Sequence, residues 1–91
     1  MAVKLRKILK VKALPDFMLS VIFENGVEKT VDFKPYFKFP VFEVLKTVHA
    51  FSGVRNSGYF IEWPGYEIDL SADTLWNDGE SVEKEAIGVS G

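Results

Sequence analysis

The sequence predicts an α+β fold: an antiparallel sheet of about five or six strands from successive hairpins, with one or two short helices. Three observations support this prediction. Apolar and polar residues alternate over several short runs, as they do in half-buried strands. The turn-forming pairs Asn25-Gly26, Ser57-Gly58 and Pro64-Gly65 separate these runs. Ser71 precedes a short apolar segment and is suited to cap a helix.

The composition is that of one small globular domain. The chain has 91 residues, of which 47% are apolar, with eight phenylalanines and no cysteine. The lack of cysteine excludes disulfides, thiolate metal sites and a cysteine nucleophile. No apolar run approaches the roughly 20 residues of a transmembrane helix, and the basic start lacks the apolar core of a signal peptide. We therefore expect a cytoplasmic protein without membrane association, with one domain over residues 1–78 and a mobile tail over 79–91.

The first expected strand covers residues 5–13, where apolar and polar side chains alternate. Because successive side chains of a strand point to opposite faces, the pattern assigns each residue to one side of the sheet. Pro15-Asp16 then ends the strand. The expected faces are Leu5, Leu9, Val11 and Ala13 toward the core, and Ile8, Lys10 and Lys12 toward solvent.

Residues 17–23 and 27–33 form the first expected hairpin, and its register can be argued from burial. A two-residue loop would pair Glu24 with Val27 and would mix acidic and apolar residues on one face. A three-residue loop pairs Phe23 with Val27 and gathers the apolar residues on one face. A one-residue slip exchanges the two faces of a strand, so burial favours the second register. It requires Gly26 at positive φ.

The second expected hairpin joins residues 54–56 to 59–63, and Trp63-Pro64-Gly65-Tyr66 then forms a type II turn. A two-residue loop at that turn pairs Trp63 with Tyr66. Short helices are expected over residues 47–51 and 72–76, the second capped by Ser71. The expected apolar face of the last two strands is Tyr59, Ile61, Trp63, Tyr66, Ile68 and Leu70, with Ile61 and Trp63 as core residues.

Glu62, Glu67 and Asp69 are the most prominent carboxylate cluster. The two-residue loop would put Glu62 opposite Glu67, with Asp69 on the same polar face. Like charges directly opposite each other are unfavourable. A basic partner, a divalent cation, Arg55 from the neighbouring strand or solvent screening would each relieve the repulsion. We expect these carboxylates to contact a partner protein and to bind no metal, because the only histidine, His49, is isolated.

Tyr36, Phe37, Phe39 and Phe42 lie in a connection bracketed by Pro35 and Pro40. They either close the open end of the core or form an exposed binding patch. We include Tyr36, Phe37 and Phe39 among the candidate partner-binding residues. The sequence contains no catalytic triad and no glycine-rich phosphate loop. We therefore expect neither enzymatic activity nor a cofactor.

Residues 63–76 have the sequence Trp-Pro-Gly-Tyr-Glu-Ile-Asp-Leu-Ser-Ala-Asp-Thr-Leu-Trp. This segment resembles the end of the bacterial family called domain of unknown function 2442 (DUF2442). Residues 31–36, 41–45 and the Phe51 region are similar to earlier segments of that family, although Ala72 stands where the family often has proline. The resemblance implies a small α+β domain and no established activity. It also suggests an antitoxin-like role beside a small toxin-like protein. We expect no helix-turn-helix after Trp76.

Charge is distributed unevenly along the chain, whose net charge is −2. Residues 1–12 carry five basic and no acidic side chains, whereas residues 62–91 carry eight acidic side chains and only Lys84 as a base. The favoured function is a protein-interaction or regulatory module. The alternative is a nucleic-acid accessory protein that uses the basic first strand, which the overall acidity makes less favourable. A homodimer by pairing of edge strands is a further expectation.

Overall fold

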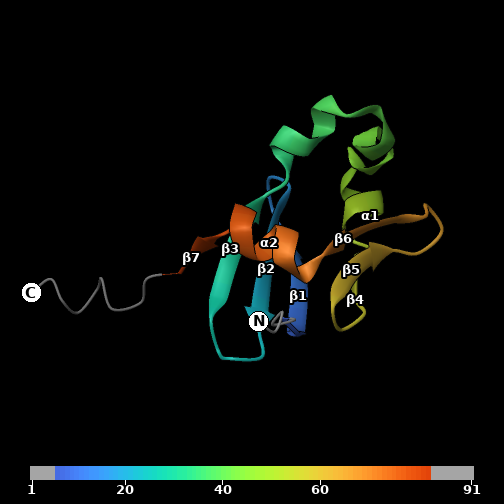
Figure 1. Ribbon diagram of the computed structural model, residues 1–91. Coiled ribbons are helices and arrows are strands. Elements are labelled where there is room, and N and C mark those ends of the chain that lie inside the picture. Colours follow the sequence, from blue (N-terminus) through green and yellow to red (C-terminus); the bar gives the residue numbers. More distant parts are fainter. Residues whose placement is uncertain (1–5, 83–91) are drawn as a thin grey trace, which may run out of the picture.

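The computed structural model describes residues 6–82, and over this range the chain forms seven short strands in two antiparallel sheets (Figure 1). The α+β prediction is confirmed, but the strands are divided between two sheets instead of forming one. The first sheet has the order β1-β2-β3-β7 and consists of β1 (Ile8–Leu14), β2 (Met18–Phe23), β3 (Glu28–Asp32) and β7 (Glu80–Ser81). The second has the order β4-β5-β6 and consists of β4 (Arg55–Asn56), β5 (Phe60–Trp63) and β6 (Ile68–Ser71).

Two short α-helices and two 3₁₀ helices complete the fold. Thr47 caps α1 (Val48–Phe51) and Ser71 caps α2 (Ala72–Asp78), each side chain accepting a hydrogen bond from a backbone N–H three residues on. Both helices were expected at these positions. The proline-bracketed connection folds as η1 (Lys34–Lys38) and η2 (Pro40–Leu45), each with a proline in its first turn. Figure 1 shows α2 crossing the front of the first sheet, with the green segment of η1 and η2 at the top and α1 below it on the right.

The two sheets are joined where β1 meets the β4–β5 hairpin. The backbone N–H of Ile8 donates to the carbonyl oxygen of Gly58 at 2.7 Å, and Asn56 Nδ2 donates to the carbonyl oxygen of Ile8 at 2.9 Å. Because β1 is otherwise the outermost strand of the first sheet, these bonds satisfy backbone groups at one end of its free edge.

The first hairpin has the predicted three-residue loop. The backbone N–H of Phe23 donates to the carbonyl oxygen of Val27 at 2.9 Å, and Gly26 has a φ of 89°. Leu19, Val21 and Phe23 are buried on the resulting face. The register that buries the apolar residues on one face is therefore the one that forms, as predicted.

The predicted faces of β1 are wrong at its start. Ile8 pairs with Phe23 and Lys10 with Ile22, so Leu9 is the extra residue of a β-bulge. The bulge shifts the alternation by one position. Ile8 is consequently 1% exposed and belongs to the core, whereas Leu9 is 57% exposed.

The last hairpin has a longer loop than the turn signal predicted. Trp63 pairs with Ile68 instead of Tyr66, so the loop contains Pro64, Gly65, Tyr66 and Glu67. Gly65 and Glu67 both have positive φ. Ile61, Trp63 and Ile68 are buried as expected, and Leu70 packs against the core, but Tyr59 and Tyr66 are exposed and do not belong to the apolar face.

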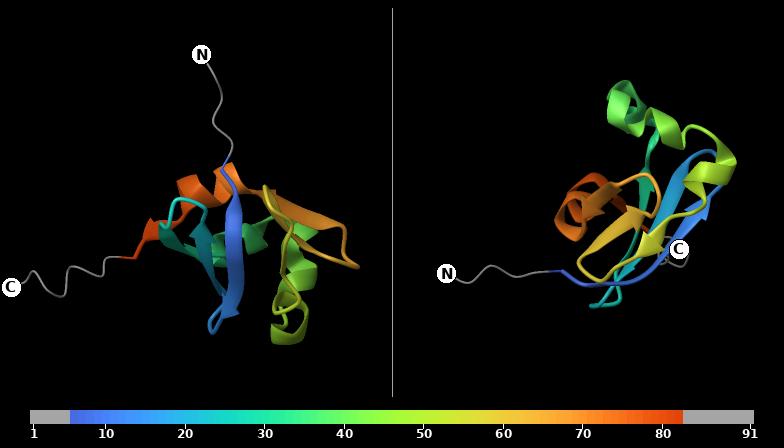
Figure 2. Two further views of the ribbon diagram at one scale, coloured as in Figure 1. Left: turned by 90° about the horizontal axis from the view of Figure 1, so that it is seen from below. Right: turned by 90° about the vertical axis from the view of Figure 1, so that its right-hand side faces the viewer.

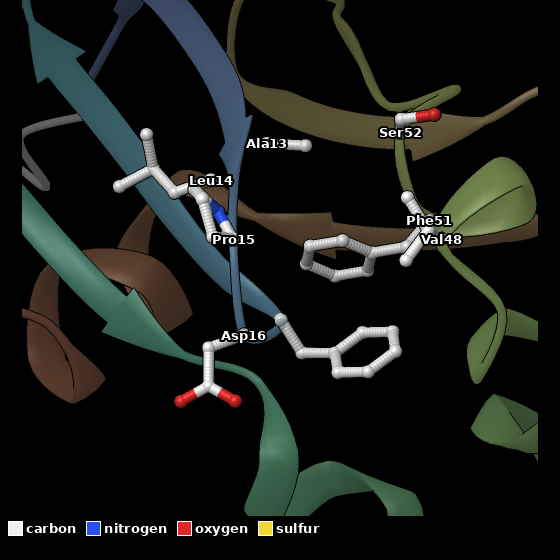
Figure 3. Close-up of a pocket in the computed structure, with 8 residues that line it drawn as sticks. Ala13, Leu14, Pro15, Asp16, Val48, Phe51 and Ser52 are labelled. Atoms are coloured by element: carbon white, nitrogen blue, oxygen red, sulfur yellow. The ribbon is translucent and has the colours of Figure 1, made fainter.

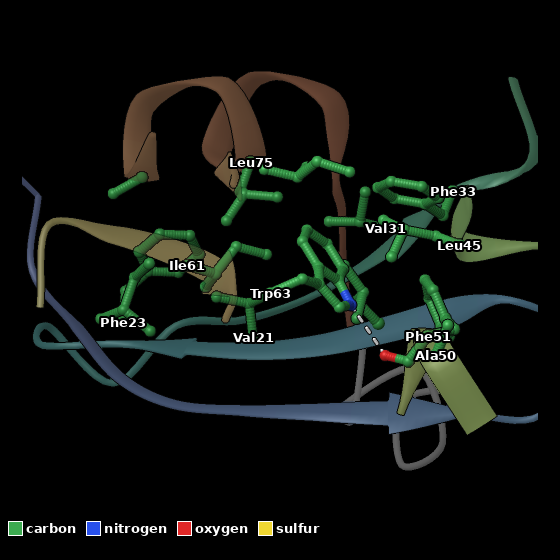
Figure 4. Packing of buried hydrophobic residues seen from close by; sticks show 14 residues of the cluster. Val21, Phe23, Val31, Phe33, Leu45, Ala50, Phe51, Ile61, Trp63 and Leu75 are labelled. Atoms are coloured by element: carbon green, nitrogen blue, oxygen red, sulfur yellow. Dashed lines mark hydrogen bonds between the residues drawn. The ribbon is translucent and has the colours of Figure 1, made fainter. Parts of the chain in front are cut away.

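The core lies between the two sheets and α2, as Figure 4 shows around the indole ring of Trp63. Ile61 and Trp63 are fully buried, which confirms their assignment to the core. Trp63 Nε1 donates to the carbonyl oxygen of Phe51 at 2.8 Å, so its polar atom is satisfied. Leu75 packs from α2 and Leu45 from η2.

The domain continues beyond the expected boundary at residue 78. β7 (Glu80–Ser81) pairs with β3, and the backbone N–H of Val82 donates to the carbonyl oxygen of Glu28 at 3.0 Å. Residues 79–82 therefore belong to the folded domain. The rest of the expected mobile tail, residues 83–91, lies outside the described residues.

Candidate partner-binding site

The outward face of the second sheet carries two of the three carboxylates singled out in the sequence. Across β5 and β6, Glu62 lies directly opposite Asp69, and Phe60 lies opposite Ser71. Arg55 of β4 lies opposite Glu62 on the other side. The buried neighbours in the same strands, Ile61 and Trp63, point to the core, so this row points away from it. We call Phe60, Glu62 and Asp69 the acidic face.

The structure corrects the predicted pairing of these carboxylates. Glu67 does not lie opposite Glu62, because the four-residue loop moves Glu67 out of the strand pairing. Glu67 is exposed in that loop beside the exposed Tyr66. The acidic face therefore contains Glu62 and Asp69, with Glu67 in the adjoining loop.

The repulsion between Glu62 and Asp69 is not balanced by an ion pair over residues 6–82, where the ion pairs involve Arg6, Lys34 and Lys46. Glu62 Oε2 accepts a 2.6 Å hydrogen bond from the neutral hydroxyl group of Ser57. This bond fixes the Glu62 side chain without neutralising its charge. The sequence from residue 60 to residue 82 contains six acidic and no basic side chains, so the negative charge extends over β5, β6 and α2.

The predicted aromatic patch is only partly exposed. Phe39 is 48% exposed. Tyr36 is half-buried, its hydroxyl group donates to Asp78, and its ring stacks on Phe42. The Phe37 ring packs edge-on against Phe33 and Phe17. Tyr36 and Phe37 therefore close the end of the core, and of the three candidates only Phe39 is available to a partner.

The exposure of three valines that follow Phe39 in the chain was not predicted from the sequence. Val41 and Val44 of η2 and Val48 of α1 are each at least 50% exposed. In a 3₁₀ helix residues three apart share one side. Val41 and Val44 therefore face outward together, while Phe42 and Leu45 face the core. The three-residue period was the signal, but the β-branched valines lower the helix propensity of this segment and made the helix hard to predict.

A pocket of about 430 Å³ lies between the β1–β2 turn and α1 (Figure 3). In Figure 3, Leu14, Pro15 and Asp16 lie on one side and Val48, Phe51 and Ser52 on the other. Its only ionisable lining group, Asp16, is 3.4 Å from the ammonium group of Lys34. The pocket therefore offers mostly apolar contacts.

Three ionisable side chains with shifted pKa values, Asp32, Lys34 and Tyr36, lie close together in the chain. The backbone N–H and the ammonium group of Lys34 donate to Asp32 and lower the pKa of its carboxyl group. Burial raises the pKa of Tyr36, and its hydrogen bond to Asp78 raises it further. The contacts between Asp32 and Lys34 hold the start of η1 in place. The hydrogen bond from Tyr36 to Asp78 holds η1 against the end of α2.

No group of three or more histidine or acidic side chains in the described part of the chain is arranged to hold a metal ion. Glu62 and Asp69 supply two carboxylates, and Glu67 is not gathered with them. No helix over residues 6–82 is long and apolar enough to span a membrane.

These features define a small α+β domain with two antiparallel sheets, a single core and an acidic outward face on the second sheet. The chain belongs to the family described as protein of unknown function (DUF2442), whose family model matches residues 8–81. The match runs from the first residue of β1 to the last of β7. No curated protein and no solved structure matches the chain significantly.

Proposed function

We propose that this protein is an interaction module that binds a basic partner protein through the acidic face. The observation that carries the proposal is the placement of Glu62 opposite Asp69 with no ion pair to either in residues 6–82, although Arg55 lies across from Glu62 on β4. Like charges at directly opposite positions of an antiparallel pair destabilise the sheet. A lysine or arginine of a partner would remove that repulsion and gain two charge-assisted contacts.

The edge position of β6 offers the partner a second mode of binding, which is strand pairing. β6 lies at the end of the second sheet, so its outer edge is available for pairing with an extended segment. Asp69 and Ser71 are two residues apart and share the outward face. An added strand with basic residues at alternate positions would place a cation next to Asp69, and Phe60 would supply apolar contact.

An antitoxin-like regulator is the biological role that we propose for this binding. A module of this kind acts by covering a basic surface of its partner and needs no catalytic group. We accordingly propose that the protein is not an enzyme and uses no cofactor. The lack of any basic residue between residues 60 and 82 supports a partner of opposite charge.

The alternative role in nucleic-acid binding has less support. Arg6, one of the five bases near the start, lies over the ring of Trp76 at 4.2 Å and 4.0 Å from Asp73. Lys10 and Lys12 are exposed on β1, but acidic side chains lie on the same face of that sheet, at Glu28 and Glu80. So few basic side chains would bind nucleic acid only weakly, and this binding would be lost at physiological salt.

Site-specific photo-crosslinking tests the proposed function. Phe60 is replaced by the photoreactive analogue p-benzoylphenylalanine, and the variant is irradiated in an extract of host cells. The matched control carries the analogue at Phe39, which has similar exposure but lies away from the acidic face. The cross-linked peptides are then identified by mass spectrometry.

We expect the Phe60 variant to cross-link one protein at a segment of net positive charge. The adduct should disappear in a Glu62→Lys, Asp69→Lys background and persist in a Glu24→Lys background, because Glu24 is an exposed acid on the first hairpin. Thermal melts establish that each variant is folded. Adducts only at Phe39, adducts with segments of no positive charge, or no adduct at residue 60 would contradict the proposal.

A further inference from the structure

On the outward face of the first sheet, basic side chains lie on one side and acidic side chains on the other. Lys12, Ser20, Thr30 and Glu80 form one row across the four strands, in which each residue pairs with the next. Cross-strand partners share a face of the sheet. The buried residues Leu19, Val21 and Val31 occupy the opposite face, so this row points away from the core.

A second row repeats the same order of charges. Lys10 of β1 pairs with Ile22 of β2, which pairs with Glu28 of β3. Ile22 and Glu28 lie two residues from Ser20 and Thr30 along their strands, so they share the same outward face. The face therefore has bases on β1, neutral and apolar side chains on β2, and acids on β3 and β7. In the right-hand view of Figure 2, α2 lies on the other side of this sheet.

We propose that this face binds the same face of a second copy of the chain, forming a two-fold dimer. A two-fold axis that runs parallel to β2, above its centre, turns the second sheet over and keeps the position along the strands. It places β1 of one copy over β3 of the other, with β7 of that other copy next to it. Lys10 then meets Glu28 of the second copy, and Lys12 lies over Thr30 and reaches Glu80 on the next strand. Two-fold symmetry makes each pair occur twice.

The centre of the interface supplies the apolar contact. Ile22 lies near the axis and meets its own counterpart, and Met18 does the same two rows further along β2. Both side chains are partly exposed in the single chain. Aligned sheets pack about 10 Å apart with their side chains interleaved. The arrangement does not use the acidic face of the second sheet, so the dimer and the proposed basic partner can bind together.

Sedimentation and charge-swap variants test the dimer. The wild-type chain is studied from about 1 to about 300 μM, at about 50 mM and about 500 mM salt. One variant carries Lys10→Glu and Lys12→Glu, and a second carries Glu28→Lys and Glu80→Lys. Lys38→Glu is the matched control, because Lys38 is exposed on η1 and away from this face. Circular dichroism melts establish that all chains are folded.

We expect a wild-type dimer whose dissociation constant rises on the order of tenfold at the higher salt. Each double variant alone should be monomeric, because its facing charges have the same sign. A mixture of the two should form a heterodimer, since the acidic β1 of one then meets the basic β3 and β7 of the other. A wild-type monomer at every concentration, a mixture that stays monomeric, or a dimer that persists in both variants would overturn the proposal. The last result would indicate pairing of edge strands instead.

Discussion

The indole Nε1 of Trp63 donates a 2.8 Å hydrogen bond to the backbone carbonyl oxygen of Phe51 inside the core. The bond joins β5 to the last residue of α1, and the two aromatic rings pack with their centroids 6.0 Å apart. Figure 4 shows it among buried side chains from both sheets. One side chain thus supplies apolar volume and also satisfies a carbonyl group at a helix end.

Replacing Trp63 separates these two contributions. Trp63→Ala should lower the free energy of unfolding by about 3–5 kcal/mol, because it removes a fully buried aromatic side chain. Trp63→Phe keeps most of the apolar contact but leaves the Phe51 carbonyl oxygen unpaired, which costs about 1–3 kcal/mol. Urea unfolding measures both. Tyr66→Ala is the control, and this exposed residue should change stability by less than about 0.5 kcal/mol. Equal losses for Trp63→Ala and Tyr66→Ala would refute the central position of Trp63.

Gly26→Ala tests the loop of the first hairpin. Gly26 has a φ of 89°, a conformation that costs an L-residue about 1–2 kcal/mol. No neighbouring atom lies within 4 Å of an added Cβ, so the loss arises from backbone strain alone. Gly53→Ala is the matched control, because Gly53 does not have positive φ and an added Cβ would lie 3.4 Å from its nearest neighbour. Thermal unfolding should show a clear drop in Tm for Gly26→Ala and a small change for Gly53→Ala. The same change at both glycines would be inconsistent with the loop.

Tyr36 should make the stability fall at alkaline pH. Burial, together with the hydrogen bond to Asp78, raises its pKa in the folded protein above the ordinary value of 10.0. The stabilisation is complete below pH 10 and is lost as the pH rises toward the folded pKa, since the unfolded chain ionises first. Tyr36→Phe should weaken this fall, whereas Tyr66→Phe, at an exposed position, should not. Urea unfolding between about pH 8 and about pH 11 measures the slopes. A wild-type slope in Tyr36→Phe would disprove the role of this hydroxyl group.

The two hairpin registers show what an apolar pattern can and cannot determine. A one-residue slip at the first hairpin would have exchanged its faces, so burial selected the pairing of Phe23 with Val27. At the last hairpin, Trp63 pairs with Ile68 and not with Tyr66, which shifts each partner by two residues. A shift of two residues preserves both faces. Burial therefore cannot detect it, and the turn signal alone gave a loop that was too short.

Other features depended on contacts between distant segments. The bulge at Leu9 reverses the expected faces at the start of β1, and no local sequence signal marks it. The division into two sheets depends on how β1 meets the β4–β5 hairpin, through Ile8 and Gly58. At the candidate site, the sequence identified Glu62 and Asp69 and their common face. It assigned Glu67 to the wrong position because it used the shorter loop.

The repulsion between Glu62 and Asp69 should lower the free energy of unfolding by a measurable amount. Asp69→Asn removes one charge with little change in shape and should raise the free energy of unfolding by about 0.2–1 kcal/mol. The gain should vanish in a Glu62→Gln background, because the opposing charge is then absent, and should shrink at high salt. Asp73→Asn is the control, since Asp73 is an exposed acid on α2 and lies next to Arg6. Urea unfolding of the four members of the cycle gives the coupling energy. A coupling of zero, or a loss of stability in Asp69→Asn that is independent of Glu62, would show that the pair is not strained and would remove the main support for a basic partner.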